Sequence, residues 1–267
     1  MQMVSAIKMR KAQAVAVESR PYRETLVEML QKVSQRINID QSPLLHPAKN
    51  AQKKKLIIFV SSNKGLAGTF HTNLARFFFK HISVKEAEFI TLGKKAASFI
   101  VSMGGEVSAS FTSNNLLVDI TPVFELALRK FLAGEVSEVS VAYNNFISTS
   151  RSATVQEVLL PFKIAVGEGS PFPSQREQFK SPEYVIEPSP EEIINPLLQS
   201  LVEEQIRGAV INSEAVEHSS RMIAMKNATD NATDVIYNLT LLGNKLRQGR
   251  ITSELLDMIT AKESVEN

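Results

Sequence analysis

The segment best suited to chemistry is a glycine-containing loop at residues 61–69, Ser-Ser-Asn-Lys-Gly-Leu-Ala-Gly-Thr. It follows an apolar run and precedes an amphipathic stretch, and nucleotide-binding α/β proteins place their phosphate loops between a strand and a helix. The spacing matches neither the dinucleotide fingerprint nor the Walker loop, which ends in Gly-Lys followed by Ser or Thr. We therefore expect a tight strand-to-helix turn at residues 63–69, and keep phosphate binding by this loop as the alternative.

Other reactive residue types are scattered along the chain. There is no cysteine, which excludes disulfides and thiolate metal sites. No histidine has a second histidine at ligand spacing on the same predicted helix. Acidic residues one helical turn apart, such as Asp230 and Asp234, are typical of solvated helix faces. The sequence thus predicts no catalytic residue, no metal site and no cofactor.

Composition places the chain among ordinary globular proteins, with 43% hydrophobic residues, 22% charged residues and a net charge of +2. The longest apolar stretch, residues 56–60, is far shorter than the about 20 residues that cross a bilayer. No secretory signal is visible at the start, so membrane attachment is expected only through a partner. Residues 1–55 are basic, which suits nucleic acid, anionic lipid, an acidic protein surface or a solvated helix face.

The middle of the chain alternates strand and helix patterns. Residues 56–60 are β-branched or aromatic for the most part, as in a strand buried on both faces. This alternation is typical of a parallel, Rossmann-like α/β sheet. Further strands are expected at 88–92, 106–111, 136–143 and 155–165, helices at 69–81, 94–103 and 122–133, and a long proline-rich surface loop at 167–190.

Two long helices are expected at the ends of the chain. The first, residues 1–38, has apolar or small side chains at alternating steps of three and four, and Pro21 predicts a kink or a lost hydrogen bond within it. Its stripe consists of Ala12, Val15, Ser19, Tyr22, Leu26, Met29 and Val33. The second, residues 197–262, contains no proline and has the spacing of a coiled-coil seam. Its stripe consists of Met222, Met225, Thr229, Ala232, Ile236, Leu239, Gly243 and Leu246.

The second helix is too long to be contained in the domain. About 65 helical residues reach roughly 100 Å, whereas a domain formed by residues 56–190 is about 30 Å across. Its apolar stripe needs a partner, and the candidate within the chain is the first helix. We therefore expect an antiparallel two-helix coiled coil standing on an α/β foot. The predicted segments are a shaft helix (1–38), a linker (39–55), the foot (56–190) and a second shaft helix (191–267).

Several stretches resemble the gamma subunits of bacterial F-type ATP synthases. Residues 219–232, Ser-Ser-Arg-Met-Ile-Ala-Met-Lys-Asn-Ala-Thr-Asp-Asn-Ala, are similar to the C-terminal signature of this family. Residues 239–255 look like its Tyr-Asn-Lys-x-Arg-Gln-x-x-Ile-Thr-x-Glu-Leu stretch. Residues 3–13 and 19–22 are similar to its N-terminal helix, including the proline. The resemblance spans the full chain in the right order.

The resemblance implies a non-catalytic rotor shaft. The two helices would lie inside the hexamer of alpha and beta subunits, and the foot would meet the epsilon subunit and the membrane-embedded c-ring. Ion-driven rotation would carry the catalytic beta subunits through their open, loose and tight states during ATP synthesis. No cofactor and no nucleic acid is implied. The chain would lie peripherally at the cytoplasmic face of the bacterial cell membrane, attached through the complex alone.

The resemblance also suggests contact positions. The family's shaft makes polar contacts with the beta subunits at positions that correspond to Arg221, Gln248, Thr252 and Glu254, and Lys8, Arg10 and Lys11 fit an acidic beta loop by charge. Tyr184 and Glu187 resemble the part of the foot near the c-ring and epsilon.

The chain departs from the family in two places. Members usually begin earlier, so either the start is misassigned or the tip near Leu255 has a short partner helix. The usual Asp-Arg-Gly-Leu-x-Gly-Gly turn is Asn-Lys-Gly-Leu-Ala-Gly-Thr at residues 63–69, which keeps the turn and changes its charges. A nucleotide-binding α/β enzyme and a coiled-coil adaptor or nucleic-acid-binding arm remain as alternatives to the rotor.

Overall fold

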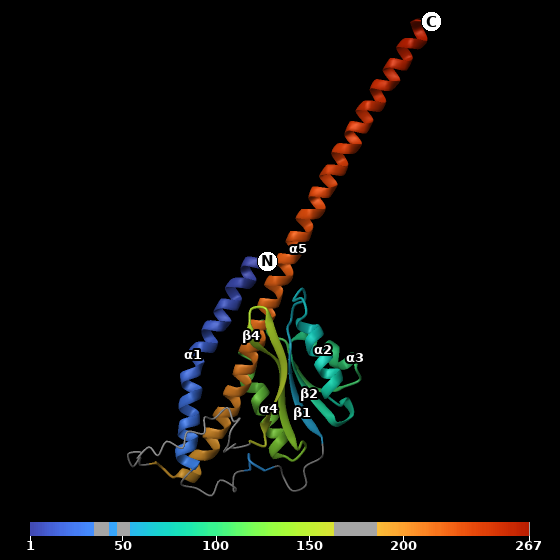
Figure 1. The fold of residues 1–267 in the computed structure, drawn as a ribbon. Coiled ribbons are helices and arrows are strands. Elements are labelled where there is room, and N and C mark those ends of the chain that lie inside the picture. The colour runs from blue at the N-terminus through green and yellow to red at the C-terminus, as the bar shows by residue number, and fades with distance from the viewer. Residues whose placement is uncertain (35–42, 47–53, 163–185, 267) are drawn as a thin grey trace.

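The computed structural model describes residues 1–34, 43–46, 54–162 and 186–266. Figure 1 shows an α/β body, a helix from each end of the chain beside it, and one of these helices continuing far beyond the body. The elements are α1 (Gln2–Ser34), β1 (Lys55–Val60), α2 (Phe70–His81), the 3-10 helix η2 (Val84–Glu86), β2 (Ala87–Leu92), α3 (Lys94–Ser102), β3 (Glu106–Phe111), α4 (Ile120–Leu132), β4 (Glu138–Ser148), β5 (Arg151–Leu160) and α5 (Pro190–Glu266).

The strands form one sheet in the order β3-β2-β1-β4-β5. The pairs β1–β2, β1–β4 and β2–β3 are parallel, as the alternating pattern predicts. The pair β4–β5 is antiparallel, so the expectation of a parallel sheet is wrong at this edge. The connection explains the difference. Ser148 pairs directly with Arg151, and this tight turn is too short for the crossover that parallel strands require.

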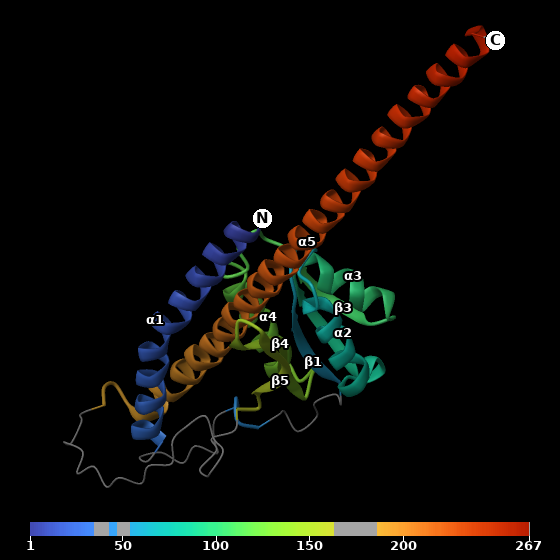
Figure 2. The ribbon, with the colours of Figure 1, turned by 45° about the horizontal axis from the view of Figure 1, so that its top comes forward.

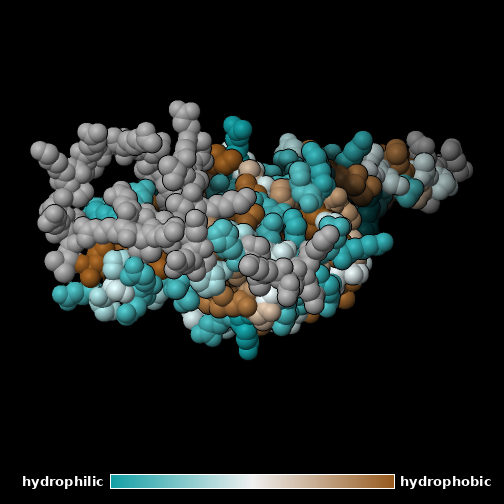
Figure 3. Space-filling model, turned by 90° about the horizontal axis from the view of Figure 1, so that it is seen from below, coloured by the Kyte–Doolittle hydropathy of each residue, from teal (hydrophilic) through white to brown (hydrophobic). Residues whose placement is uncertain are grey.

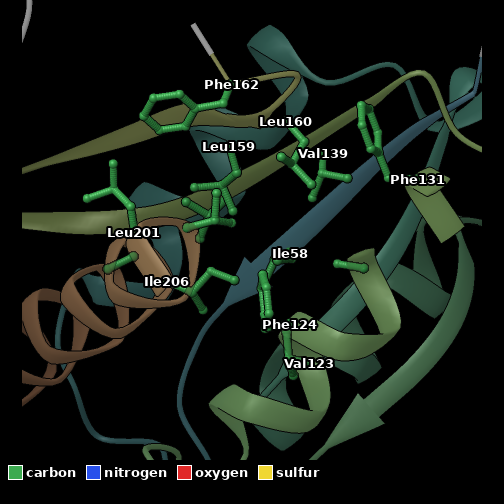
Figure 4. Close-up of a cluster of buried hydrophobic side chains, with 14 of the residues drawn as sticks. Ile58, Val123, Phe124, Phe131, Val139, Leu159, Leu160, Phe162, Leu201 and Ile206 are labelled. Carbon is green, nitrogen blue, oxygen red and sulfur yellow. The ribbon is translucent and has the colours of Figure 1, made fainter. Parts of the chain in front are cut away.

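Helices cover both faces of the sheet. Successive residues of β1 point to opposite faces, so Ile58 faces α4, α1 and the first part of α5, while Ile57 and Phe59 face α2 and α3. Figure 4 shows the first of these cores, where strand residues meet Phe124 of α4 and Ile206 of α5. The lower part of α5 is therefore built into the body as well as into the shaft.

The helix α5 begins at Pro190, one position before the predicted second shaft segment 191–267 and ahead of the proline-free stretch 197–262. Pro190 occupies the first helical position, and the Glu192 amide donates to Ser189 Oγ at 3.3 Å. Ser, Pro and two glutamates in this order form a favourable helix start, because they cap free amides and place negative charge at the positive end of the helix dipole. The helix also continues through Pro196 and has 77 residues in all, or about 115 Å.

The helix α1 packs antiparallel along the lower part of α5, as expected (Figures 1 and 2). It continues through Pro21 and is curved. Its inward face is shifted from the predicted stripe in its second half, because Tyr22 and Met29 are exposed while Leu30 is buried. The residues of α1 that are buried are Ser5, Met9, Ala12, Leu26, Leu30 and Val33.

The predicted seam of α5 lies beyond the reach of α1. Met222 and Met225 are partly buried, but every residue from 226 to 262 is exposed. Within the described chain, α1 therefore accompanies α5 only up to the start of the predicted seam, as the alternative of a short partner helix predicts. About 60 Å of helix stands free of the body in Figure 1. We refer to residues 226–266 as the tip.

Two predicted segments fall largely outside the described residues. The linker at 39–55 is described only at 43–46 and 54–55, where Leu44 is buried and accepts a hydrogen bond from the Phe162 amide. The proline-rich stretch 167–190 is described only from residue 186.

Candidate functional site

The tip carries apolar side chains on all of its sides. Val235, Ile236 and Tyr237 are consecutive and so point about 100° apart around the helix, and each is at least 55% exposed. Polar residues lie between the apolar ones, but large exposed apolar side chains in this number are typical of an interaction surface. The tip also exposes Leu239, Leu241, Leu242, Leu246, Ile251, Leu255, Leu256, Met258 and Ile259. This surface is suited to enclosure by other chains from every direction.

Small and polar residues interrupt this apolar surface. Gly243 and Gly249 have no neighbouring atom within 4 Å of where a Cβ would stand. Of the predicted contact residues, Thr252 donates to the carbonyl of Gln248 at 2.9 Å, and Glu254 accepts from Arg250 Nε at 3.0 Å. All of these lie on the tip and are exposed, so they are available to a surrounding partner.

The start of α1 presents the predicted basic group to solvent. Lys8, Arg10 and Lys11 are exposed, while Met9 between them is buried against α5. The hydrogen bond from His218 lowers the pKa of Glu214 on α5, and the charges of Lys8 and Lys11 lower it further. This cationic group therefore lies close to α5, near the level at which the tip leaves the body.

Arg221 lies at the boundary between body and tip, and its side chain is turned inward. It is 9% exposed and donates to the carbonyls of Gly65 and Lys64, at 3.3 and 3.4 Å. It also pairs with Glu217 at 2.5 Å and lies 3.1 Å from His218 Nδ1. We call this arginine and the loop at residues 61–69 the collar. The structure thus shows that Arg221 is bonded to other residues of the same chain, which its position in the sequence does not reveal.

The collar loop does not have the geometry of a phosphate loop. Its carbonyls face Arg221, and Asn63 holds the loop to the body by donating to the Ser113 carbonyl at 2.7 Å. Gly68 has a φ of +54°, and a Cβ there would lie 3.3 Å from the Ser220 carbonyl of α5. The glycine is therefore needed for close packing against α5, as a tight turn predicts.

A histidine completes the packing under the collar. His71 Nδ1 lies 3.3 Å from Ser61 Oγ, and Nε2 lies 3.2 Å from Ser62 Oγ. Burial lowers the pKa of His71, so the ring is held in its neutral form. No carboxylate is bonded to the His71 ring among the described contacts. The ring and the two hydroxyls instead stabilise the turn.

The opposite end of the body is the predicted contact region of the foot. Glu187 is exposed there, just before α5 begins, whereas Tyr184 lies outside the described residues. Seen from below, the described surface mixes hydrophilic and hydrophobic residues (Figure 3). The structure therefore places Glu187 far from Gln248, Thr252 and Glu254, which lie at the other end of α5.

Across the described ranges, no helix is long and apolar enough to cross a membrane. No three His, Cys, Asp or Glu side chains in those ranges are grouped as metal ligands. An α/β body that is joined at a collar to a free helix, with apolar side chains on every side of that helix, is typical of stalk subunits of larger assemblies.

Comparisons with known proteins identify the assembly. The family model described as ATP synthase matches residues 1–265. The chain is 34% identical over 274 residues to the ATP synthase gamma chain of Akkermansia muciniphila, covering 100% of this chain and 92% of that one. It is 32% identical over 279 residues to the gamma chain of Chloroherpeton thalassium, covering 100% and 91%. The chain therefore belongs to the ATP synthase gamma chain family, whose members are the non-catalytic rotor subunit of F-type ATP synthase.

Solved structures have the same fold. The central stalk and c-ring structure of the Tetrahymena thermophila mitochondrial ATP synthase matches with a TM-score of 0.58 and 20% identity, over 86% of this chain and 97% of that one. A chain of the Euglena gracilis mitochondrial ATP synthase matches with a TM-score of 0.63 and 14% identity, over 99% and 94%. The two-helix arrangement on an α/β body is thus found in other rotor structures.

Proposed function

We propose that this chain turns inside a hexamer of alpha and beta subunits and couples rotation of a c-ring to the conformational cycle of the beta subunits. The single observation that carries the proposal is the free tip. A helix of about 60 Å with apolar side chains on every side is costly to leave in water, so it requires partners all around it. A ring of subunits meets this requirement, whereas a partner on one side leaves most of the tip exposed.

The mixture of residues on the tip suits a surface that moves past its partners. Large apolar residues are interspersed with Thr229, Ala232 and Gly243, whose small side chains offer a partner little contact area. Polar contacts spread among Gln248, Thr252 and Glu254 could form and break in turn against three beta subunits, because each exposed contact contributes little free energy. We infer that contacts at these positions orient the tip without holding it at one rotational angle.

The basic group of α1 gives the shaft a preferred contact with acidic surfaces. Lys8, Arg10 and Lys11 are exposed on α1 near the collar, where the lower rim of a surrounding hexamer would lie. Complementary charge on a beta subunit would orient the shaft at each stop and would be weakened by salt. We propose an acidic beta loop as its partner.

Arg221 has a different part in this proposal. Its guanidinium is already bonded to Gly65, Lys64 and Glu217, so its effect on a beta subunit would be exerted mainly through the collar loop that it holds. The exposed 11% of the side chain is the part left for direct contact.

The lower end of the body is the proposed attachment to the c-ring and the epsilon subunit. Glu187 is exposed at this end, and Tyr184 is close to it in sequence. Attachment here, with no spanning helix in the described ranges, would hold the chain peripherally at the cytoplasmic face of the membrane through the complex alone.

Cross-linking tests the proposal. A cysteine at Glu254, oxidised to a cysteine introduced in a facing beta subunit, should stop ATP turnover that depends on rotation, and reduction should restore it. A cysteine at Glu191, at the far end of α5, is the matched control and should not cross-link to beta. A chain that purifies without alpha and beta, or turnover that survives the Glu254 cross-link, would contradict the proposal.

A further inference from the structure

A buried histidine of α5 lies beside the collar. His218 is 7% exposed, and its two ring nitrogens contact groups of opposite charge. Nδ1 lies 3.1 Å from Arg221 Nη1, and Nε2 lies 3.5 Å from Glu214 Oε1. The ring therefore bridges the arginine of the collar and a carboxylate one turn away on the same helix.

These two contacts determine where the His218 ring carries its proton. A guanidinium has only N–H donors and no acceptor, so the hydrogen bond with Arg221 requires Nδ1 to be the acceptor and to carry no proton. The one N–H of a neutral imidazole then belongs to Nε2, which faces a carboxylate that accepts it. In this structure His218 is therefore the neutral tautomer with its proton on Nε2.

The bond to His218 completes the set of acceptors around the Arg221 guanidinium. Nε donates to the Gly65 carbonyl, and Nη2 donates to the Lys64 carbonyl and to Glu217 Oε1. Nη1 donates to His218. The Arg221 side chain is only 11% exposed, so a nitrogen that loses its acceptor there is poorly compensated by water.

Protonation of His218 would turn its contact with Arg221 from attraction into repulsion. An imidazolium carries a proton on both nitrogens, so two N–H groups and two positive charges would face each other across 3.1 Å. Glu214 would still accept from Nε2 and would attract the charged ring more strongly than the neutral one. The repulsion would therefore act on the guanidinium and weaken its hold on the collar loop.

We propose that His218 is a pH-sensitive positioning residue of the collar. As a neutral ring it holds the Arg221 guanidinium against the Gly65 and Lys64 carbonyls, and on protonation it releases this side chain. Arg221 joins the collar loop to α5 where the tip leaves the body, so acidification loosens that joint. The effect on torque rests on the proposed function, whereas the contact itself does not.

The charges around this part of α5 come from every element packed there. Besides the two groups that His218 contacts, they belong to Glu217 of α5, Lys8 and Lys11 of α1, Lys64 of the collar loop, His71 of α2, Lys95 of α3 and Arg151 of β5. The hydrogen bond from His218 lowers the pKa of Glu214, and the neighbouring positive charges lower it further. Glu214 therefore stays ionised over the range in which histidines titrate.

His71 does not perform the same task. It is bonded to two hydroxyls and not to Arg221, and burial lowers its pKa. A proton on His71 would affect the serines of the turn, whereas a proton on His218 would meet the guanidinium directly. The two histidines can therefore be separated by substitution.

NMR of the full chain tests the inference. Proton–nitrogen correlations of the ring distinguish the two neutral tautomers, and His218 should carry its proton on Nε2 at about pH 8. Exchange of the Arg221 Nε proton with water reports the bond to Gly65. In His218→Gln the amide can accept from Arg221 and donate to Glu214 at any pH. At about pH 5, exchange in the parent chain should be about fivefold faster or more than in this variant, and at about pH 8 the two should be equal.

Two further variants serve as controls. His218→Leu removes the acceptor without adding a charge, so exchange at Arg221 Nε should be fast at both pH values. His71→Gln removes the other histidine near the collar and should keep the acid-induced change. Circular dichroism of each variant shows whether the helices are retained.

Three results would overturn the role of His218. These are a ring with its proton on Nδ1, or with two protons, at about pH 8, equal exchange in the parent chain and in His218→Gln at about pH 5, and loss of the acid-induced change in His71→Gln. None of these readouts depends on rotation or on assembly with other subunits, so this inference and the rotor function can fail independently.

Discussion

Arg221 of α5 donates through Nε to the carbonyl of Gly65 at 3.3 Å, across 156 positions of the sequence. The contact joins the turn after β1 to the shaft at the level where α5 leaves the body. Below this level, Ile194, Leu198 and Ile206 of α5 lie in the core of the body. Torque applied to the foot therefore reaches the tip through a packed core and a hydrogen-bonded collar.

Replacing Arg221 should loosen the collar. Arg221→Ala leaves the Gly65 and Lys64 carbonyls and Glu217 without their donor, so the free energy of unfolding should fall by about 2–4 kcal/mol. Arg221→Lys keeps the charge but cannot form the same set of bonds, and should recover only part of the loss. Arg247→Ala on the exposed tip is the control, expected within about 0.5 kcal/mol of the parent chain. Equal effects at positions 221 and 247, in urea denaturation, would contradict the role of the collar.

Two glycines of α5 should respond to alanine by different amounts. A Cβ at Gly208 would lie 2.5 Å from Arg23 Nη2 of α1, whereas one at Gly243 would meet nothing within 4 Å. Gly243→Ala should raise the helix stability of the tip by up to about 1 kcal/mol. Gly208→Ala should gain less, because the end of the flexible Arg23 side chain must move aside and this offsets part of the same gain. Thermal and urea unfolding of both variants measure the difference, and a larger gain at position 208 than at position 243 would contradict the close approach of Arg23 to α5.

The neutral state of His71 predicts a pH dependence of stability. Burial lowers the pKa of His71 in the folded chain below the about 6.5 of an unfolded histidine. Its stabilising contribution is therefore present above about pH 6.5 and is lost as the pH falls through the folded-state pKa. His71→Gln should flatten the loss of stability on acidification, measured by urea unfolding between neutral and acid pH. The account of His71 is wrong if the variant loses stability on acidification as steeply as the parent chain.

A matched pair of isoleucines on α5 separates folding from assembly. Ile206 is fully buried in the body, and Ile236 is 64% exposed on the tip. Ile206→Ala should cost about 2–5 kcal/mol of stability in the isolated chain. Ile236→Ala should cost little there, but should weaken assembly with alpha and beta subunits. Unfolding measurements and pull-down yields report the two effects, and a loss of isolated-chain stability at Ile236 equal to that at Ile206 would show that the tip is not free.

Much of the fold follows from local sequence patterns. The apolar run at β1, the alternation of strands and helices, and the two long terminal helices are short-range features, and the structure confirms them. The direction of β5 was missed because the pattern of a strand does not reveal which way it pairs. That depends on the short connection at residues 149–150. The start of α5 carries a readable signal, because Ser189 is followed by Pro190 and two glutamates.

The site was less predictable than the fold. Resemblance points to Arg221, but only the three-dimensional arrangement shows that its partners are Gly65 and Lys64 of the collar loop. In the same way, the spacing of apolar or small residues along α1 favours Tyr22 and Met29, whereas the structure exposes both and buries Leu30. A polar groove between α1 and α5 has no sequence signature, because its lining comes from two helices about 180 positions apart: Ser19, Tyr22, Ser200, Glu203, Glu204 and Arg207. Partner contacts on the tip depend on other chains and cannot be read from this one.

The most direct measurement is rotation of the assembled complex. A reconstituted alpha–beta hexamer containing this chain is fixed to a surface through beta and labelled with a bead at Lys85→Cys, an exposed position at the end of the body away from the collar. The bead should turn in one direction when ATP is supplied. The Glu254-to-beta cross-link should stop it, and reduction should restart it. A bead that stays fixed while ATP is hydrolysed at an undiminished rate would contradict the central claim that this chain is the rotor.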